Sequence, residues 1–113
     1  MNSLSGEFDV EIGKKKYTCH LSMNAFRILC ERENLTFQQM DAYISGQPLT
    51  AVPKVIYYGL MNHIYVTRGD LSKLPEFEYF ASQILNDASD LEKYSTLIGK
   101  AFGGESEEDE GNE

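Results

Sequence analysis

The chain has 113 residues, of which ten are basic and eighteen are acidic, giving a net charge of −8. This length suits one domain with a single core. The charge argues against a nucleic-acid backbone or an anionic membrane as partner, because binding to phosphates needs clustered Lys and Arg. Residues 1–6 lack the features of a signal peptide, and the longest apolar run, 55–61, is far shorter than a membrane span. The sequence therefore predicts a cytoplasmic protein.

The first predicted element is a β-hairpin centred on Gly13-Lys14, with apolar and polar residues alternating on both sides of this pair. Glycine at the first turn position favours a type II′ turn, which needs a positive φ there. That turn sets a register with the apolar side chains on one face and polar pairs on the other. The predicted pairs are Val10–Tyr17, Phe8–Cys19, Glu11–Lys16 and Asp9–Thr18. Lys14-Lys15-Lys16 is read as a solvated turn.

Two helices with strong end signals follow the hairpin. Ser22 is a suitable N-cap for the first, and Asn34 suits the left-handed position that ends it. Thr36 and Gln39 form a capping box for the second helix, which is expected to stop at Gly46. The residues predicted to face inward are Met23, Phe26, Leu29 and Cys30 in the first helix and Phe37, Met40 and Ile44 in the second, with Tyr43 as a further candidate.

A third helix is predicted over residues 51–65, with Thr50 as its cap and Pro53 tolerated in the first turn. It is apolar almost all round, so it is either the buried centre of the fold or partly covered by a partner. Gly59 in its middle is expected to permit a close helix crossing.

Two amphipathic helices are predicted in the last third of the chain. One begins around residues 71–75, and the other opens with a capping box of Ser89 and Glu92 and ends at Gly103-Gly104. Their inward-facing residues are expected to be Phe77, Phe80, Ala81, Ile84 and Leu85, then Leu91, Tyr94, Ile98, Ala101 and Phe102. From Glu105 the chain reads ESEEDEGNE, which has nothing to bury and predicts disorder.

These elements together predict an α+β fold that is mainly α. It consists of an N-terminal β-hairpin, about five helices and a disordered acidic C-terminal tail. We expect a flexible N-terminus over residues 1–6, a single helical domain with the hairpin over 7–103 and the tail over 104–113.

The sequence offers no constellation for catalysis or for metal binding. Cys19 and His20 are neighbours in a strand, so their side chains point to opposite faces and cannot act together. No zinc-ligand spacing and no glycine-rich phosphate loop is present. Cys19 and Cys30 both fall on predicted core faces, which favours reduced, buried thiols. We therefore predict a protein without enzymatic activity, cofactor or metal.

The aromatic residues point instead to a binding surface. The chain carries seven Tyr, six Phe and no Trp, more than a domain of this size readily buries. An exposed apolar patch rimmed by charge marks a protein-binding site; the alternative is a plain core with tyrosines at its edge. The candidate partner-binding residues are Tyr57, Tyr58, Met61, Tyr65, Phe77 and Tyr79.

The order of segments carries a family resemblance. The hairpin is followed by HLSMNAFRILCERENLTFQQM, then PLTAVPKVIYYGL, two amphipathic helices and a charged tail. Over about residues 8–102, this order resembles the tail assembly chaperones of long-tailed phages and gene transfer agents. Their hairpin is followed by L-x-M/F-N/T-A-hydrophobic, a Glu-rich helix end, N/G-L-S/T-F and L-x-x-hydrophobic-hydrophobic-x-x-G-L. The matching residues are Leu21, Met23, Asn24, Ala25, Phe26, Leu35, Thr36, Phe37, Gly59 and Leu60.

The resemblance implies a non-enzymatic phage or prophage chaperone in the host cytoplasm. Its client would be the long, helical tape measure protein, kept soluble while tail tube subunits assemble around it. The tail tube protein is a second candidate partner, and the aromatic excess is compatible with a homo-oligomer. A charge at Tyr57 or Tyr58 is then expected to abolish client binding without unfolding the domain. A generic acidic interaction or inhibitor module that binds a basic partner stays open, and its binding would collapse with salt.

Overall fold

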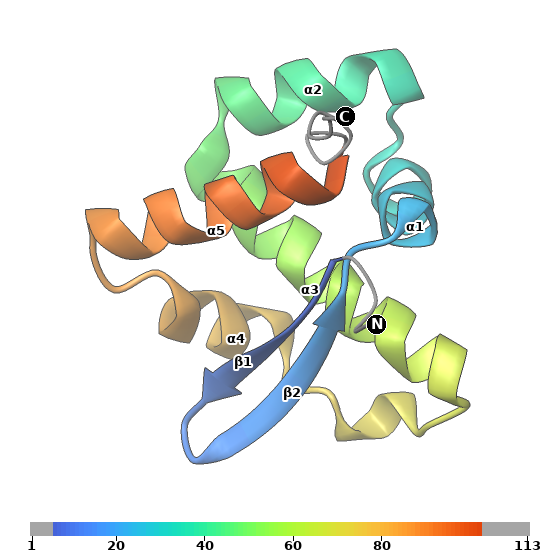
Figure 1. Cartoon of the computed structure of the whole chain (residues 1–113), viewed down its shortest axis with the longest axis vertical. Helices are drawn as coiled ribbons and strands as arrows, with labels where there is room; N and C mark the ends of the chain where they lie inside the picture. The colour runs from blue at the N-terminus through green and yellow to red at the C-terminus, as the bar shows by residue number, and fades with distance from the viewer. Residues whose placement is uncertain (1–5, 103–113) are drawn as a thin grey trace, which may run out of the picture.

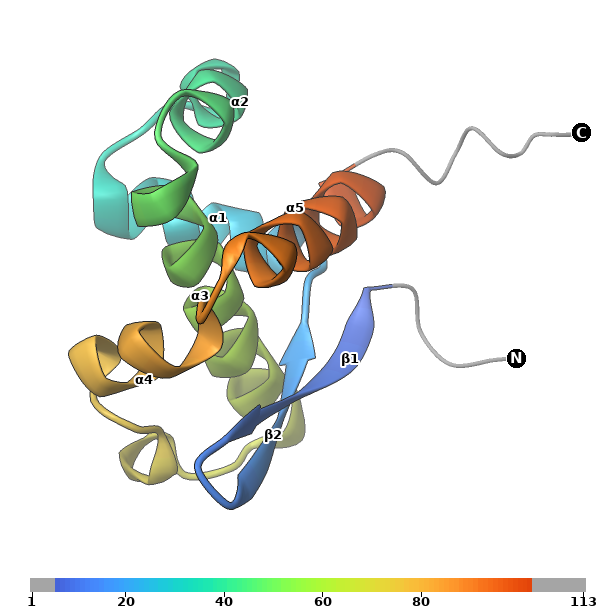
Figure 2. The ribbon, with the colours of Figure 1, turned by 90° about the vertical axis from the view of Figure 1, so that its left-hand side faces the viewer.

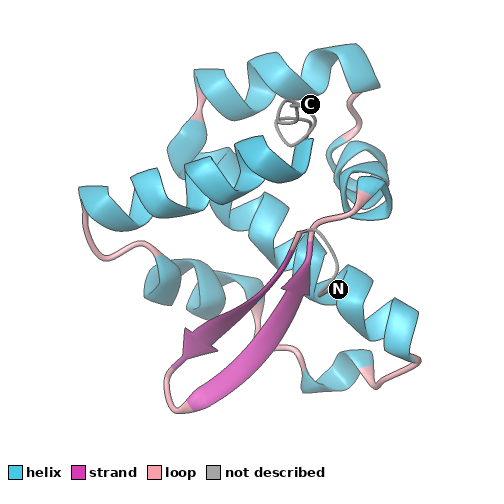
Figure 3. Ribbon diagram, in the orientation of Figure 1, coloured by secondary structure: helices cyan, strands magenta, loops and turns pink. Residues whose placement is uncertain are grey.

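The computed structural model describes residues 6–102 and confirms the predicted fold class (Figures 1 and 3). Within this range a two-stranded antiparallel hairpin precedes five α-helices and one 3₁₀ turn. The elements are β1 (Glu7–Ile12), β2 (Lys15–His20), α1 (Met23–Glu33), α2 (Phe37–Gly46), α3 (Pro48–Thr67), η1 (Leu71–Lys73), α4 (Phe77–Ile84) and α5 (Ala88–Phe102). The expectations for residues 1–5 and for the tail from 103 onward lie outside the described residues. No helix among residues 6–102 has both the length and the apolar character to cross a membrane.

The hairpin has the predicted register. Val10 pairs with Tyr17 and Phe8 with Cys19. Gly13 has a φ of +64°, as a type II′ turn requires. On the polar face, the Thr18 hydroxyl lies 3.1 Å from Asp9 Oδ1 and donates a hydrogen bond to it. Local turn chemistry and alternation were therefore sufficient to place this element.

The predicted caps of α1 and α2 are confirmed. Ser22 Oγ accepts the backbone N–H of Asn24, and Asn34 ends α1 in the left-handed region with a φ of +58°. The capping box is reciprocal, because Thr36 Oγ1 accepts the Gln39 N–H at 3.2 Å and the Gln39 side chain accepts the Thr36 N–H at 2.8 Å. These bonds satisfy backbone groups that a helix end leaves unpaired.

Two residues predicted to face the core are exposed instead. Met23 is 58% exposed and Phe37 is 52% exposed. The buried face of α1 runs through Ala25, Phe26, Ile28 and Leu29, so it is rotated from the predicted stripe. Ala25 and Ile28 are as compatible with a core as Met23 and Cys30, and only packing against α3 decides between the two faces.

Helix α3 is the buried centre of the fold, one of the two predicted alternatives. It runs through the middle of the molecule, with the hairpin and α5 on one side and α4 on the other (Figure 2). The helix starts at Pro48 instead of after Thr50, because proline fits the first helical position. Its most deeply buried residues include Val52, Val55, Ile56, Leu60 and Asn62.

Gly59 permits a close approach, but to the hairpin and not to another helix as predicted. A Cβ at this position would collide with the Cys19 sulfur and lie 2.8 Å from Cδ2 of Leu21. Asn62, one turn further along α3, donates hydrogen bonds to His20 O at 2.9 Å and Ser22 Oγ at 3.0 Å. Its Oδ1 accepts a bond from Asn24 at 2.8 Å. The end of the hairpin is thus attached to α3 by close packing at Gly59 and by the hydrogen bonds of Asn62.

The last third differs from prediction at two helix starts. Residues 71–73 form the 3₁₀ turn η1, and α4 begins only at Phe77, after Pro75, a residue whose ring disfavours helical backbone in the residue before it. Helix α5 is capped by Asp87 and not by Ser89, since Asp87 Oδ1 accepts the Ser89 hydroxyl at 2.6 Å and the Asp90 N–H at 3.1 Å.

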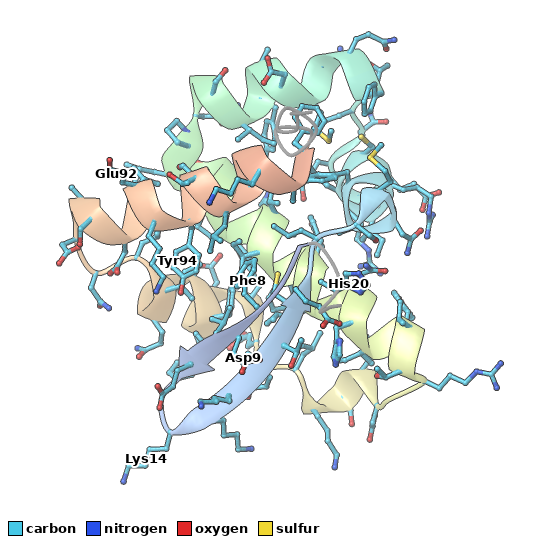
Figure 4. The ribbon with its side chains drawn as sticks, in the orientation of Figure 1. Phe8, Asp9, Lys14, His20, Glu92 and Tyr94 are labelled. Carbon is cyan, nitrogen blue, oxygen red and sulfur yellow. The ribbon has the colours of Figure 1, made fainter. Side chains whose placement is uncertain are left out.

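The predicted apolar stripe of α5 is confirmed by Tyr94 and Ile98, which are both buried. The Tyr94 ring packs against Phe8 of β1, with ring centroids 6.4 Å apart (Figure 4). At the other end of α5, Phe102 lies 5.3 Å from the Phe26 ring and 5.8 Å from Phe37. Helix α5 therefore connects the hairpin with the helical pair α1–α2.

Candidate functional site

A groove of about 650 Å³ lies between the end of α1, the middle of α3 and the segment from η1 to the start of α4. We call it the aromatic groove. Its apolar lining includes Tyr57, Tyr58, Met61, Leu71, Leu74 and Phe77. Charged side chains from α1, α3 and the segment before α4 border it: Arg32, Glu33, Lys54 and Glu76. An apolar floor with a charged rim is the usual composition of a protein-binding surface.

Tyr57 forms one wall of the aromatic groove and is held in place from two sides. Its ring meets Phe77 edge-on, with centroids 5.2 Å apart and an interplanar angle of 81°, and it lies 5.1 Å from Phe80. Its hydroxyl donates a 2.6 Å hydrogen bond to the Pro75 carbonyl. Tyr57 therefore ties the chain before α4 to α3 and fixes the width of the groove.

An ion pair and a phenol also line the aromatic groove. Lys54 Nζ lies 2.8 Å from Glu33 Oε1, and the Tyr58 hydroxyl donates a 2.6 Å hydrogen bond to Glu33 Oε2. Burial alone raises the pKa of Glu33, but the hydrogen bonds from Lys54 and Tyr58 outweigh it and hold this pKa below its ordinary value. Glu33 is therefore a carboxylate at neutral pH, bonded to both neighbours.

The same contacts keep the two donors protonated. The hydrogen bond to Glu33 raises the pKa of Lys54 against the opposing effect of burial. Burial raises the pKa of Tyr58, and its bond to the Glu33 carboxylate raises it further. Neither group is a base or a nucleophile at neutral pH in this state. The hydrogen bonds among Glu33, Lys54 and Tyr58 hold this part of the groove rigid, and its apolar lining is suited to contact with apolar side chains of a partner.

The aromatic groove unites four of the six predicted partner-binding residues. Tyr57 and Phe77 are half-buried and present part of their rings to the groove, whereas Tyr58 and Met61 are only 8% and 6% exposed. Tyr58 thus belongs to the core as much as to the groove, and a charge placed there is expected to unfold the domain. Of the two tyrosines, the expectation that a charge abolishes client binding without unfolding the domain therefore remains for Tyr57 alone.

The other two predicted residues, Tyr65 and Tyr79, are exposed but do not line the aromatic groove. Tyr79 lies at the hairpin turn, where its hydroxyl would be 3.1 Å from a Cβ added to Gly13. Sequence reasoning missed Leu71, Leu74 and Pro75 as lining residues of the groove. Their apolar character between two helices was the one signal available.

A second apolar surface lies between α1 and α2. Met23, Phe26, Arg27, Cys30 and Phe37 enclose a shallow hollow of about 250 Å³ there. Met23 and Phe37 are the two residues predicted to be core and found exposed. This surface adds to the apolar area that the described part of the chain presents to solvent.

The cysteines and histidines do not gather into a reactive centre among residues 6–102, and no group of three or more His, Cys, Asp or Glu there could hold a metal ion. Both cysteines are free. Cys19 is fully buried with its thiol directed at the Ile56 carbonyl, and burial raises its pKa strongly. Cys30 is only half-buried and lies 3.9 Å from the Met40 sulfur.

No protein-family model, curated protein or solved structure matches this chain. The aromatic groove and the order of the sequence segments are therefore the grounds for assigning a function.

Proposed function

We propose that the protein is a non-enzymatic tail assembly chaperone of a phage or prophage. In this role it binds the tape measure protein in the host cytoplasm and keeps it soluble while the tail tube assembles. The observation that carries the proposal is the aromatic groove, a preformed apolar hollow with a charged rim on a small acidic protein. The sequence resemblance supplies the identity of the client.

The chemistry of the groove suits an apolar stripe on a helix. Amphipathic helices bind by inserting side chains spaced three and four residues apart into a hydrophobic groove. Leu71, Leu74 and Phe77 offer apolar contact on one side, and Tyr57 and Met61 offer it on the other. Covering such a stripe would remove the surface through which a long apolar protein aggregates. The net charge of −8 would keep the resulting complex dispersed.

Co-expression with the long helical protein encoded just downstream tests the proposal. We expect the soluble fraction of that protein to rise when this chain is present, and the two to co-purify. Leu71→Glu should abolish both effects while the domain stays folded, because Leu71 lines the groove and is already 38% exposed. Leu49→Glu is the matched control, since Leu49 is 71% exposed on α3 and does not line the groove.

Salt separates this proposal from the generic acidic module. Binding through apolar contact should persist when the ionic strength is raised, whereas binding of a basic partner by acidic residues should be lost. Equal solubility of the downstream protein with and without this chain would contradict the chaperone proposal.

A further inference from the structure

A second groove, separate in character from the aromatic one, lies between β2 and the C-terminal half of α3. It has a volume of about 380 Å³ and is bordered by Lys15, Lys16 and Thr18 of β2, His63 of α3, and Asp70 and Lys73 around η1. We call it the cationic groove. Among residues 6–102, Leu74 is the one residue that lines both grooves.

Positive charge is concentrated in the cationic groove. Three lysines line it, and Asp70 is the sole carboxylate among its described lining residues. The Asp70 carboxylate bonds to its neighbour in the chain and not to a lysine of the groove. Its Oδ1 accepts the Ser72 N–H at 3.0 Å and the Ser72 hydroxyl at 2.8 Å. Lys15 and Lys16, which the sequence assigns to a solvated turn, thus line the same groove as a third lysine, Lys73.

The cationic groove also offers neutral hydrogen-bond donors. A two-residue turn closes with a hydrogen-bonded pair, here Ile12–Lys15, so the alternation along β2 turns the N–H groups of Lys16 and Thr18 away from β1. His20 has the same phase, and its carbonyl indeed accepts a bond from Asn62 of α3. The groove therefore offers backbone N–H and ammonium groups to an anion.

The chain carries its own complementary segment. Residues 105–113 contain six of the eighteen acidic side chains and no basic or apolar one, so the other 104 residues hold twelve acidic and ten basic side chains. Most of the net charge of −8 is thus in these nine residues. An acidic peptide of this length matches a groove with three lysines and strand-edge N–H groups.

The position of the last helix favours the groove of another copy over that of the same molecule. Helix α5 ends beside α1 and α2, whereas the turn bearing Lys14 lies at the opposite end of a molecule that is 41 Å long (Figures 1, 2 and 4). The eleven residues after Phe102 span about 36–40 Å only when fully extended, and a flexible chain of that length typically spans about 18 Å. The groove of its own molecule is therefore close to the limit of reach.

We propose that the cationic groove binds the acidic C-terminal segment, residues 105–113, of a second copy of this chain. The contact is head-to-tail, since the donating and accepting surfaces differ, so it can extend from copy to copy. It rests on screened charges at a surface and is therefore weak and sensitive to salt.

Sedimentation velocity on the full chain is the first test. We expect the average mass to rise with protein concentration at low salt, and the association constant to fall by roughly tenfold or more at high salt. A chain that ends at Gly104 should stay monomeric under both conditions. Association that survives this truncation, or a full chain that remains monomeric at low salt, would overturn the proposal.

Charge-reversal variants locate the acceptor. Lys15→Glu with Lys73→Glu should abolish association, whereas Arg27→Glu with Lys93→Glu makes the same change in net charge outside the groove and should leave it much less affected. All four side chains lie at the surface, so the fold should be retained. Circular dichroism checks this point for each variant.

Mixing two non-associating chains gives the sharpest test. The Lys15→Glu/Lys73→Glu chain keeps its acidic segment, and the chain ending at Gly104 keeps its groove. We expect each to be monomeric alone and the two to form a one-to-one complex when mixed. Two monomers in the mixture would refute the proposal, whatever the outcome of the client-binding experiments.

Discussion

Two faces of α3 are built for different purposes. Around Gly59 and Asn62 the face toward the hairpin is tightly packed, because Gly59 touches Cys19 and Leu21 and the Asn62 side chain uses its polar atoms in three hydrogen bonds. The face toward α4 leaves the aromatic groove open beside half-buried rings. An atom added to a tightly packed face lowers the stability of the fold, whereas a substitution beside an open groove has a smaller effect on stability. Stability and binding can therefore be altered separately on one helix.

Gly59→Ala should produce the largest effect on the tightly packed face. The added methyl group meets the Cys19 sulfur and Leu21, so we expect a loss of about 1–3 kcal/mol in the free energy of unfolding. Urea denaturation measures this loss. Gly99→Ala in α5 is the matched control, because no atom outside the helix lies within 4 Å of the new Cβ and the substitution should stabilise by about 0.5–1 kcal/mol. Equal effects at both positions would show that the hairpin contact is loose.

Glu33→Gln tests the ionic end of the open face. The hydrogen bonds from Lys54 and Tyr58 to the carboxylate predict a loss of about 1 kcal/mol at neutral pH. Since the folded pKa of Glu33 is lowered, its contribution is present above the unfolded value of about 4.3 and is lost as the pH falls through the folded value. The wild-type chain and the Glu33→Gln variant should therefore converge in stability in acid, as urea denaturation at a series of pH values would measure.

The control for this pair is Glu31→Gln. Glu31 pairs with Arg27 on the same helix, but the two side chains are 69% and 56% exposed. Such a pair contributes about 0.5 kcal/mol or less. If Glu31→Gln lowers the free energy of unfolding as much as Glu33→Gln does, the bonds around Glu33 contribute no more to stability than an exposed ion pair.

Tyr57→Phe should lower stability less than Gly59→Ala, by an amount similar to Glu33→Gln, and should have the most local effect on motion. Losing the hydroxyl removes one hydrogen bond to Pro75, worth about 0.5–1.5 kcal/mol, and leaves the edge-on contact with the Phe77 ring in place. Hydrogen exchange should increase at residues 76–77 and stay unchanged in the hairpin. Tyr65→Phe, on an exposed part of the same helix, should change neither quantity.

What could be predicted from the sequence follows the range of the interactions. The hairpin register, the Ser22 cap and the capping box at Thr36 depend on residues within a few positions of one another, and all three were predicted correctly. The inward face of α1 and the partner of Gly59 depend on elements far away in the chain. The first was predicted correctly for Phe26 and Leu29 but wrongly for Met23, and the second was wrong. Local chemistry determines helix ends, whereas tertiary packing determines helix rotation.

The same distinction explains the candidate site. The aromatic excess in two predicted helices drew attention to Tyr57, Tyr58 and Phe77, together with Met61, and the fold does bring these four together. Leu71, Leu74 and Pro75 were missed because their place in the groove arises from η1 folding back along α3. No local pattern in residues 68–76 indicates that return.

The hydrogen bond from Tyr57 to Pro75 has a thermodynamic consequence for any ligand. Because the two walls of the aromatic groove are already joined, the protein has little conformational entropy to lose there on association. The entropic cost of ordering then falls mainly on the ligand. A client segment that is helical before the encounter should therefore bind more tightly than the same segment in an unfolded state. The heat capacity change of binding should be more negative for the unfolded segment, because that segment also folds when it binds.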